Sequence, residues 1–203
     1  MKDLYIIRHG ETELNRLGIV QGRGVNSDLN ENGKNQAAAF YKKYHHIKFD
    51  KIYISSLVRT KQTVSAFIND GIPFESWSNL DEMSWGDFEG QTHSTENSEA
   101  FAQLNDDWKS GNLDAKFDGG ESPNEVAKRL KTALIHIFGK ANEKNVLICM
   151  HGRALRIILC LLLNKPLTEM NTFTHSNTTL YHLRLHDNHK IELISADDTS
   201  HLI

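Results

Sequence analysis

Residues 4–12 read Leu4-Tyr5-Ile6-Ile7-Arg8-His9-Gly10-Glu11-Thr12, an apolar run that passes directly into charged and polar side chains. A continuous apolar run is typical of a strand that is covered on both faces of a parallel sheet. Val146-Leu147-Ile148-Cys149-Met150 has the same character, and Lys51-Ile52-Tyr53-Ile54 predicts a third strand. These three segments indicate the centre of an α/β fold.

Segments of helical period lie between the predicted strands. Asn30 is a suitable cap for a helix whose apolar face consists of Ala37, Phe40, Tyr41 and Tyr44. Ser122 and Glu125 predict a capping box at the start of a second helix. Its apolar stripe consists of Val126, Ala127, Leu130, Ala133, Leu134 and Ile137. A third helical pattern covers residues 57–68 and stops at Asn69-Asp70-Gly71.

The order of these elements predicts an α/β fold: a single three-layer α/β/α domain over residues 1–203, with a mostly parallel central sheet. Near the end, 181–185 and 191–193 are predicted to form two strands joined by a turn at Asp187-Asn188. The interval from Leu80 to Gly120 is rich in loop-forming residues, and we expect an insertion that caps the edge of the sheet. A chain of 203 residues suits one well-packed domain better than two.

The composition argues against several classes of protein. A hydrophobic fraction of 39% with 24% charged residues is that of a soluble globular protein, and the net charge of -3 gives no reason to expect nucleic acid or a membrane as partner. The longest apolar stretch, Ala154 to Leu163, is interrupted by Arg156 and is too short to cross a bilayer. Cys149 and Cys160 lie in apolar stretches and predict buried reduced thiols, so we expect a cytoplasmic protein.

Chemically useful side chains follow each predicted strand. Arg8 and His9 follow the first, Arg59 comes shortly after the second, and His151 follows the third. Because ligands of α/β proteins bind at the carboxyl ends of the strands, we expect these groups to converge. Guanidinium groups match phosphate oxygens, and they lower the pKa of a neighbouring imidazole so that a ring nitrogen stays nucleophilic. The sequence therefore predicts phosphoryl transfer, and a second imidazole, if protonated, can balance charge on the transferring oxygens.

Two glycines support this interpretation. Gly10 and Gly152 allow the backbone to come close to a ligand, and helices that begin after them would direct N–H groups toward an anion. The alternative for each histidine is a loop residue without a chemical role. Convergence of two histidines and two arginines from distant parts of the chain is difficult to explain by packing alone.

The chain also resembles a known family, the histidine phosphatase superfamily of phosphoglycerate mutase-like proteins. Residues 8–12, together with Asn15 and Gln21-Gly22, are similar to the signature of that family. The resemblance continues through four further segments in the expected order, which are 55–63, 80–90, Gly119-Gly120-Glu121-Ser122 and Met150-His151-Gly152. A single Arg-His-Gly would be weak support, whereas five ordered segments cover nearly the whole chain.

The resemblance implies a role for each matching residue. His9 would be the nucleophile that becomes phosphorylated, and Glu82 would protonate the leaving alkoxide and then help to activate water. The phosphoryl group would be surrounded by Arg8, Asn15, Gln21, Gly22, Arg59, His151 and Gly152. Neither a metal nor another cofactor is expected, since the arginines supply the positive charge. Asp87 and Glu89 remain competitors of Glu82 for the acid role.

Three functions are compatible with such a site. The first is a phosphatase acting on a small phosphorylated metabolite, and the second is a phosphoglycerate mutase that uses the same phosphohistidine. Between Gln91 and Asp118 the basic side chains that could hold a second anionic group are Lys109 and Lys116, which favours hydrolysis. The third is a non-catalytic phospholigand-binding module, which the retained nucleophile and acid argue against. The partner is expected to be the metabolite, and a homodimer is left open.

Several other side chains have weaker predictions. Arg153 either follows the phosphate or points to solvent at the start of a helix, and residues 175–177 are candidates to reach the site. Trp85 is a candidate substrate contact, whereas Trp77 and Trp108 suit packing. The remaining histidines are read as surface or helix-face residues, and they include His45, His46, His93 and His136.

Overall fold

A computed structural model describes residues 1–92 and 94–203, so the surface assignment of His93 lies outside the described residues. Within this part of the chain six strands form one sheet in the order β3-β2-β4-β1-β5-β6. The strands are β1 (Lys2–Arg8), β2 (Lys51–Ile54), β3 (Phe74–Ser76), β4 (Asn145–Met150), β5 (Leu180–Leu185) and β6 (Ile191–Asp198). The first four in the sheet order are parallel, and β5 and β6 are antiparallel, which confirms the mostly parallel sheet.

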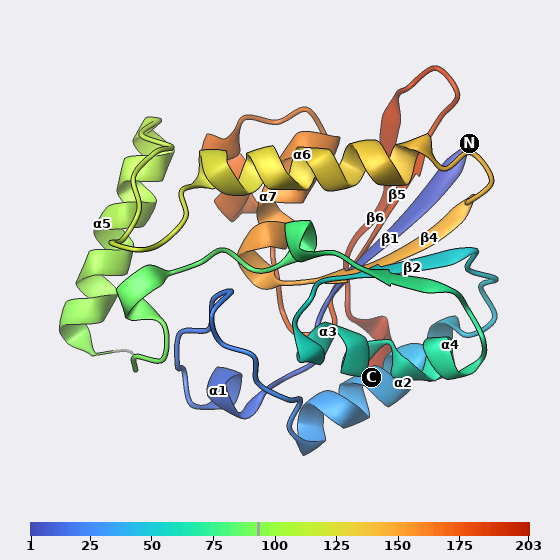
Figure 1. Cartoon of the computed structure of the whole chain (residues 1–203), viewed down its shortest axis with the longest axis horizontal. Helices are drawn as coiled ribbons and strands as arrows, with labels where there is room; N and C mark the ends of the chain where they lie inside the picture. The colour runs from blue at the N-terminus through green and yellow to red at the C-terminus, as the bar shows by residue number, and fades with distance from the viewer. Residues whose placement is uncertain (93) are drawn as a thin grey trace.

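Helices cover both faces of the sheet, as expected for three layers (Figure 1). The α-helices are α1 (Glu13–Arg16), α2 (Glu31–Tyr44), α3 (Val58–Thr63), α4 (Ser65–Asn69), α5 (Thr95–Ser110), α6 (Pro123–Gly139) and α7 (Gly152–Leu162). Short 3-10 turns are η1 (Ser78–Leu80), η2 (Gly86–Phe88), η3 (Leu167–Thr172) and η4 (Ser200–Leu202). Helices α6 and α7 lie on one face, and α2, α3 and α4 lie on the other.

Two hydrophobic cores follow from the alternation of side chains along the buried strands. Ile6 and Ile148 point to the core beneath α6 and α7, whereas Ile7 and Cys149 point to the core beneath α2 and α4. Because β1 and β4 are paired in register, with Ile6 opposite Ile148, equivalent side chains enter the same core. Burial on both faces explains why these strands are apolar throughout.

The predicted helix caps are confirmed. Asn30 accepts a hydrogen bond from Gly33 N at 2.8 Å at the start of α2. Ser122 and Glu125 form both bonds of the capping box of α6. The apolar stripe of α6 is buried throughout, at Val126, Ala127, Leu130, Ala133, Leu134 and Ile137.

The predicted helix over 57–68 is interrupted, because Val64 separates α3 from α4 with φ −109° and ψ 14°. Side-chain hydroxyls compete for the helical carbonyls at this point. Thr63 donates to Arg59 O at 2.7 Å, and Ser65 donates to Gln62 O at 2.9 Å. Such local bonds offer the backbone an alternative to the regular helix.

The interval 80–120 contains a long helix, α5, that the sequence analysis did not predict. Its many Asn, Asp and Ser residues are typical of turns, which obscured the helical pattern. Leu104 and Trp108 nevertheless join the same core as α6 and α7, and Trp108 is 1% exposed. The interval is therefore packed against the rest of the domain. Strand β3, at the edge of the sheet, was missed as well.

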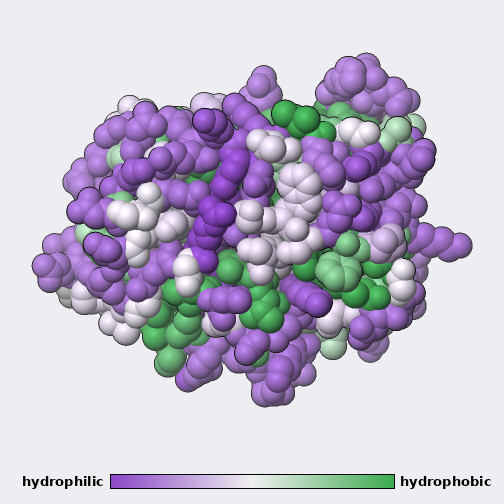
Figure 2. Space-filling view, in the orientation of Figure 1, coloured by the Kyte–Doolittle hydropathy of each residue, from purple (hydrophilic) through white to green (hydrophobic). Residues whose placement is uncertain are grey.

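Other expectations concern the surface and the thiols. In residues 1–92 and 94–203 no helix has both the length and the apolar character that spanning a membrane requires. The face in view in Figure 2 is mostly hydrophilic, with separate apolar patches.

Cys149 and Cys160 are free and buried, as predicted.

Gly33 provides a test of how tightly α2 packs against the loop that follows β1. A Cβ atom at Gly33 would lie 2.0 Å from Glu11 O and 2.7 Å from Glu11 N, and both are backbone atoms. We therefore expect Gly33→Ala to lower the free energy of unfolding by about 1–3 kcal/mol, although alanine is the better helix former. Gly139→Ala, where a Cβ meets nothing within 4 Å, is the control and should be neutral or stabilising. Urea denaturation measures both, and equal stabilities would contradict the close packing.

Candidate active site

The carboxyl ends of three parallel strands bring the predicted residues together. Strand β4 lies between β2 and β1, so the segments that follow these strands are neighbours. His9 comes directly after β1, and His151 comes directly after β4 as the N-cap of α7. Their ring centroids are 5.1 Å apart. Arg59, in the first turn of α3 after β2, is fully buried, and its guanidinium reaches His151.

The tautomer of His9 follows from its hydrogen bond. Nδ1 lies 2.7 Å from Gly10 O, and a carbonyl can only accept, so Nδ1 carries the proton of the neutral ring. Nε2 then holds the free electron pair. Burial lowers the pKa of His9 well below its usual value, and the charges of Arg8 and Arg59 lower it further. His9 is therefore neutral at physiological pH, with a nucleophilic nitrogen available.

The tautomer of His151 is fixed in the opposite sense. Arg59 Nε donates to His151 Nδ1 at 3.2 Å, so the ring proton sits on Nε2, which donates to Ser55 Oγ at 2.7 Å. Burial lowers the pKa of His151 well below its usual value, and Arg59 adds to the effect. His151 is thus a neutral hydrogen-bond donor in this arrangement. The condition for charge balance by a second imidazole, that it be protonated, is not fulfilled in this arrangement.

The two predicted phosphate-binding arginines are held by backbone carbonyls. Arg59 donates to Val25 O at 2.6 Å and to Gly22 O at 3.4 Å, and Arg8 Nη1 donates to His175 O. Burial lowers the pKa of each arginine to about 10, so both remain charged at neutral pH. Arg8 Nε is buried without a hydrogen-bond partner in the described residues. This N–H remains as a donor for a ligand oxygen.

Positive charge is in excess on this side of the sheet. Within the described residues neither Arg8 nor Arg59 has a carboxylate within 4.0 Å, and the same holds for Arg153 and Arg156 on α7. The carboxylate whose charge acts most strongly on both Arg8 and Arg59 is Glu82. The local geometry thus supplies the positive potential that the net charge of the chain does not.

Glu82 is 7% exposed, and its carboxylate contacts the first backbone N–H groups of α7. Its Oε1 accepts from Met83 N at 2.8 Å and from Ala154 N at 3.0 Å, and its Oε2 accepts from Arg153 N at 3.0 Å. A carboxylate is favoured at a helix N-terminus by the free N–H groups and the helix dipole. The anion that these N–H groups of α7 bind is thus the Glu82 carboxylate.

The competing carboxylates have other positions. Glu89 accepts from Gly24 N at 2.8 Å and Trp85 N at 2.9 Å, so it joins two loops. Asp87 is part of the η2 turn. Glu82 is the one of the three whose carboxylate contacts the backbone next to His151, which favours it as the acid.

The remaining predicted phosphate ligands lie around this centre in different ways. Asn15 is at the third position of α1, where its Oδ1 accepts from Thr12 N at 3.2 Å, which leaves its amide nitrogen to donate. Gln21 Nε2 donates to Thr12 Oγ1 and its Oε1 accepts from Ser27, so Gln21 stiffens the loop rather than presenting a free group. A Cβ atom at Gly152 would lie 3.5 Å from Arg8 Nε. Gly152 therefore keeps the approach to this nitrogen open.

Residues 175–177 reach the site through both backbone and side chains. His175 O binds Arg8, and Asn177 Nδ2 donates to His9 O at 3.1 Å. Arg153 does not point freely to solvent. Its guanidinium donates to Asn171 Oδ1 at 2.6 Å and lies 5.0 Å from the ring centroid of Trp108 and 5.7 Å from that of Trp85. Trp85, a candidate substrate contact, is 8% exposed and belongs to the core.

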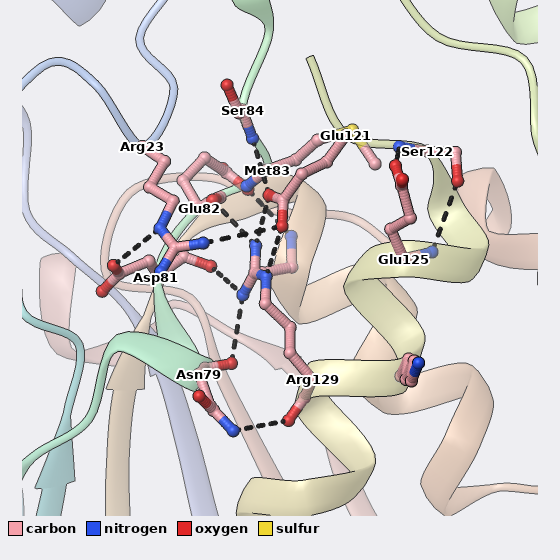
Figure 3. Close-up of polar contacts among 12 residues, drawn as sticks. Arg23, Asn79, Asp81, Glu82, Met83, Ser84, Glu121, Ser122, Glu125 and Arg129 are labelled. Atoms are coloured by element: carbon pink, nitrogen blue, oxygen red, sulfur yellow. Dashed lines mark hydrogen bonds and ion pairs between the residues drawn. The ribbon is translucent and has the colours of Figure 1, made fainter. Parts of the chain in front are cut away.

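Some residues of the site were not found from the sequence. Ser55, which orients His151, is a small polar residue without a distinctive pattern. Arg129 on α6 donates to the main-chain carbonyl of Glu82 and also to the Glu121 carboxylate (Figure 3). The available signal was an arginine on the polar face of a well-capped helix, and this is also typical of a surface residue.

No three His, Cys, Asp or Glu side chains of residues 1–92 and 94–203 gather as a metal site would need.

Comparisons with known proteins agree with this geometry. A profile of the histidine phosphatase superfamily (branch 1) matches residues 4–198. A Hydrogenobacter thermophilus relative with the provisional name phosphoserine phosphatase 2 is 34% identical over 165 residues, 80% of this chain and 79% of the relative. The adenosylcobalamin/alpha-ribazole phosphatase of Salmonella typhimurium is 28% identical over 171 residues, 82% of each. A mutant phosphoserine phosphatase from Entamoeba histolytica, solved with phosphoserine, superposes with a TM-score of 0.86 at 28% identity over the full length of both chains.

The buried neutral histidines predict how stability depends on pH. Burial lowers the pKa of His9 and His151 well below the usual value, that of His175 to about 3 and that of His201 to about 4. In the unfolded chain each histidine has a pKa of about 6.5, so below that pH the unfolded state binds more protons. The free energy of unfolding should therefore fall as the pH drops from 7 to 5, by up to about 1.4 kcal/mol per pH unit for each histidine.

The variant His9→Asn isolates one of these protons. Its slope of unfolding free energy against pH between 5 and 6 should be smaller by about one proton, measured by urea denaturation across this range. His189→Asn, at an exposed turn, is the matched control and should keep the slope of the unaltered protein. An unchanged slope in His9→Asn would mean that His9 titrates alike in both states.

Proposed function

The chain belongs to the histidine phosphatase superfamily (branch 1) and is a phosphatase, and from this we propose that it hydrolyses phosphomonoesters of small metabolites through a phosphohistidine formed on His9. No metal takes part in the proposed reaction, because Arg8 and Arg59 supply the positive charge around the phosphoryl group. The observation that carries the proposal is the fixed tautomer of His9. Its Nδ1–H is held by Gly10 O, which leaves the Nε2 electron pair for attack on phosphorus.

The first proposed step forms the N–P bond between His9 Nε2 and the phosphorus atom. The P–O bond to the alcohol breaks, and its electron pair stays on the alcohol oxygen. Glu82, which takes up a proton once the negatively charged phosphate is bound beside it, delivers that proton to the alcohol oxygen. Arg8 Nε, the amide nitrogen of Asn15 and the His151 imidazole are the proposed donors to the phosphoryl oxygens. His151 would exchange its bond to Ser55 for one to the phosphate.

The second step returns the enzyme to its starting state. Water attacks phosphorus, Glu82 takes a proton from that water, and the N–P bond breaks with its electrons returning to His9 Nε2. Inorganic phosphate leaves. The same carboxyl group thus acts as an acid in the first step and as a base in the second. It gives up a proton in the first displacement at phosphorus and regains one in the second.

Similarity to phosphatases of small molecules supports the proposed class of substrate. The Entamoeba protein was solved with phosphoserine, and the Salmonella relative is named for alpha-ribazole. These substrates differ, so we propose a small phosphorylated metabolite without naming one. We further propose that the protein works in the cytoplasm, which the free, buried thiols of Cys149 and Cys160 support.

A mutase needs basic side chains that hold the second anionic group of its substrate. They keep the dephosphorylated molecule bound until the phosphoryl group is transferred back to it from the histidine. Both lysines between residues 91 and 118 are already paired, Lys109 with Asp106 at 3.2 Å and Lys116 with Glu125 at 2.8 Å. Arg153 and Arg156 add positive charge from α7, but both guanidiniums donate to Asn171 Oδ1. Water is therefore the favoured acceptor. A non-catalytic module is disfavoured, because His9 and Glu82 are both present.

His9→Ala should abolish the reaction at its first step. The unaltered protein is expected to hydrolyse p-nitrophenyl phosphate in the presence of EDTA, and rapid acid-free quenching should trap an acid-labile phosphoryl group on His9. The variant should lose activity by at least about a thousandfold, since the covalent route is closed. Equal activity in both proteins would refute the mechanism. Interconversion of 2- and 3-phosphoglycerate by the unaltered protein, faster than phosphate release, would instead favour the mutase.

Glu82→Gln should separate substrates by their leaving groups. An alkoxide needs a proton to leave, whereas p-nitrophenolate does not, so we expect a loss of kcat/KM of about 100-fold or more for an alkyl phosphate and much less for the aryl phosphate. Glu89→Gln is the matched control, because the Glu89 carboxylate accepts from Gly24 N and Trp85 N and not from the start of α7. A uniform loss in Glu82→Gln would argue against the acid role.

A further inference from the structure

A single guanidinium holds the main chain of the loop that carries Glu82 (Figure 3). Arg129, on α6, donates from Nη1 to Asn79 O at 3.0 Å and Asp81 O at 2.8 Å, and from Nη2 to Glu82 O at 2.9 Å. These three carbonyls follow one another around a segment that leaves the sheet after β3. In return, Asn79 Nδ2 donates to Arg129 O at 3.2 Å. The loop is therefore tied to α6 in both directions.

Glu121 fixes Arg129 and extends the contact to the other side of Glu82. Its carboxylate accepts from Arg129 Nε at 2.8 Å and from Arg129 Nη2 at 2.9 Å, a bidentate pair. The same carboxylate accepts from Ser84 N at 2.9 Å, and Glu121 N donates to Ser84 O at 2.8 Å. The main chain of residues 79, 81, 82 and 84 is thus held by Arg129 and Glu121.

The loop is also joined to the segment that holds Arg59. Arg23 Nε donates to Asp81 Oδ2 at 3.2 Å, and its Nη1 lies 3.7 Å from Glu121. Arg23 directly follows Gly22, whose carbonyl accepts from Arg59. Asp81 in turn accepts from Ser56 N at 2.8 Å. The network therefore connects the proposed acid with the proposed phosphate-binding arginine.

We propose that Arg129 is a positioning residue that acts through Glu82. The Glu82 carboxylate is bound at the N-terminus of α7, while its carbonyl is bound by Arg129 on α6, and these two helices pack against each other. Glu82 is held at its main chain and at its carboxylate by one helical layer, which limits the positions that its carboxyl oxygens can adopt. Loss of Arg129 frees the main-chain end. Proton transfer depends steeply on donor–acceptor geometry, so the step that Glu82 performs should suffer most.

This inference rests on the proposed function, and its test uses the leaving group as the readout. The values of kcat/KM for an alkyl phosphate and for p-nitrophenyl phosphate are measured in the unaltered protein, Arg129→Met, Arg129→Lys, Glu82→Gln and the double variant Arg129→Met with Glu82→Gln. We expect Arg129→Met to lose at least about tenfold more on the alkyl than on the aryl substrate. The double variant should be no slower on the alkyl phosphate than Glu82→Gln alone, because both changes remove the same step.

Two controls separate positioning from stability. Val126→Ala opens a cavity beneath the same helix, since Val126 is fully buried, and it should lower the melting temperature without changing the ratio of alkyl to aryl activity. Arg129→Lys keeps the charge with fewer donors and should show an intermediate ratio. It also keeps the proposal testable if Arg129→Met fails to fold, because an unchanged ratio in Arg129→Lys would then overturn it.

The outcomes distinguish this inference from the proposed function. If Glu82→Gln itself slows both substrates equally, the acid role fails and the positioning role falls with it. If Glu82→Gln discriminates between the substrates but Arg129→Met does not, the acid role stands and the role of Arg129 is structural only. A double variant whose losses multiply would likewise show that Arg129 acts independently of Glu82.

Discussion

Arg59 is fully buried beside His151, and Arg8 has a buried Nε next to Gly152, while neither arginine forms an ion pair within the described residues. Buried charge without a counterion is costly, and the protein offsets the cost with carbonyl oxygens. Those carbonyls come from residues 22, 25 and 175, far apart in the chain. The loops that contain these three residues thus bring carbonyl oxygens to the two guanidiniums.

The same requirement determines the state of the histidines. Next to two guanidiniums a buried imidazole stays neutral, and each ring then has one donor and one acceptor nitrogen. Gly10 O selects the tautomer of His9, and Arg59 selects that of His151. One histidine is thereby left with a free electron pair, and the other with an N–H that donates to Ser55 Oγ. Burial and the neighbouring charges keep both rings neutral, and the hydrogen-bond partner of each Nδ1 determines the tautomer.

The sequence predicted the elements that depend on local patterns. Buried strands and the capped helix α6 carry their signals within a few residues, and His9, Arg59 and His151 could be placed because they follow strands. Helix α5 was missed because its burial depends on Trp108 meeting α6 and α7 from a distant part of the chain. Ser55 and Arg129 were missed for the same reason, since their partners are carbonyls and rings that only the tertiary fold brings near. The position of Glu82 was expected, but its bonds to the N-terminus of α7 were not.

The excess of positive charge at the site also affects how the protein responds to its surroundings. A site with guanidiniums that lack counterions favours binding of small oxyanions. An anion that binds the folded state alone raises the free energy of unfolding in proportion to the logarithm of its concentration, once that concentration exceeds the dissociation constant. At ten times the dissociation constant the gain is about 1.4 kcal/mol. Inorganic phosphate, the product of the proposed reaction, is such an anion. The arrangement proposed to bind the substrate would thus make product inhibition and thermal protection two effects of one equilibrium. The protein would be slowest and most stable where phosphate is abundant.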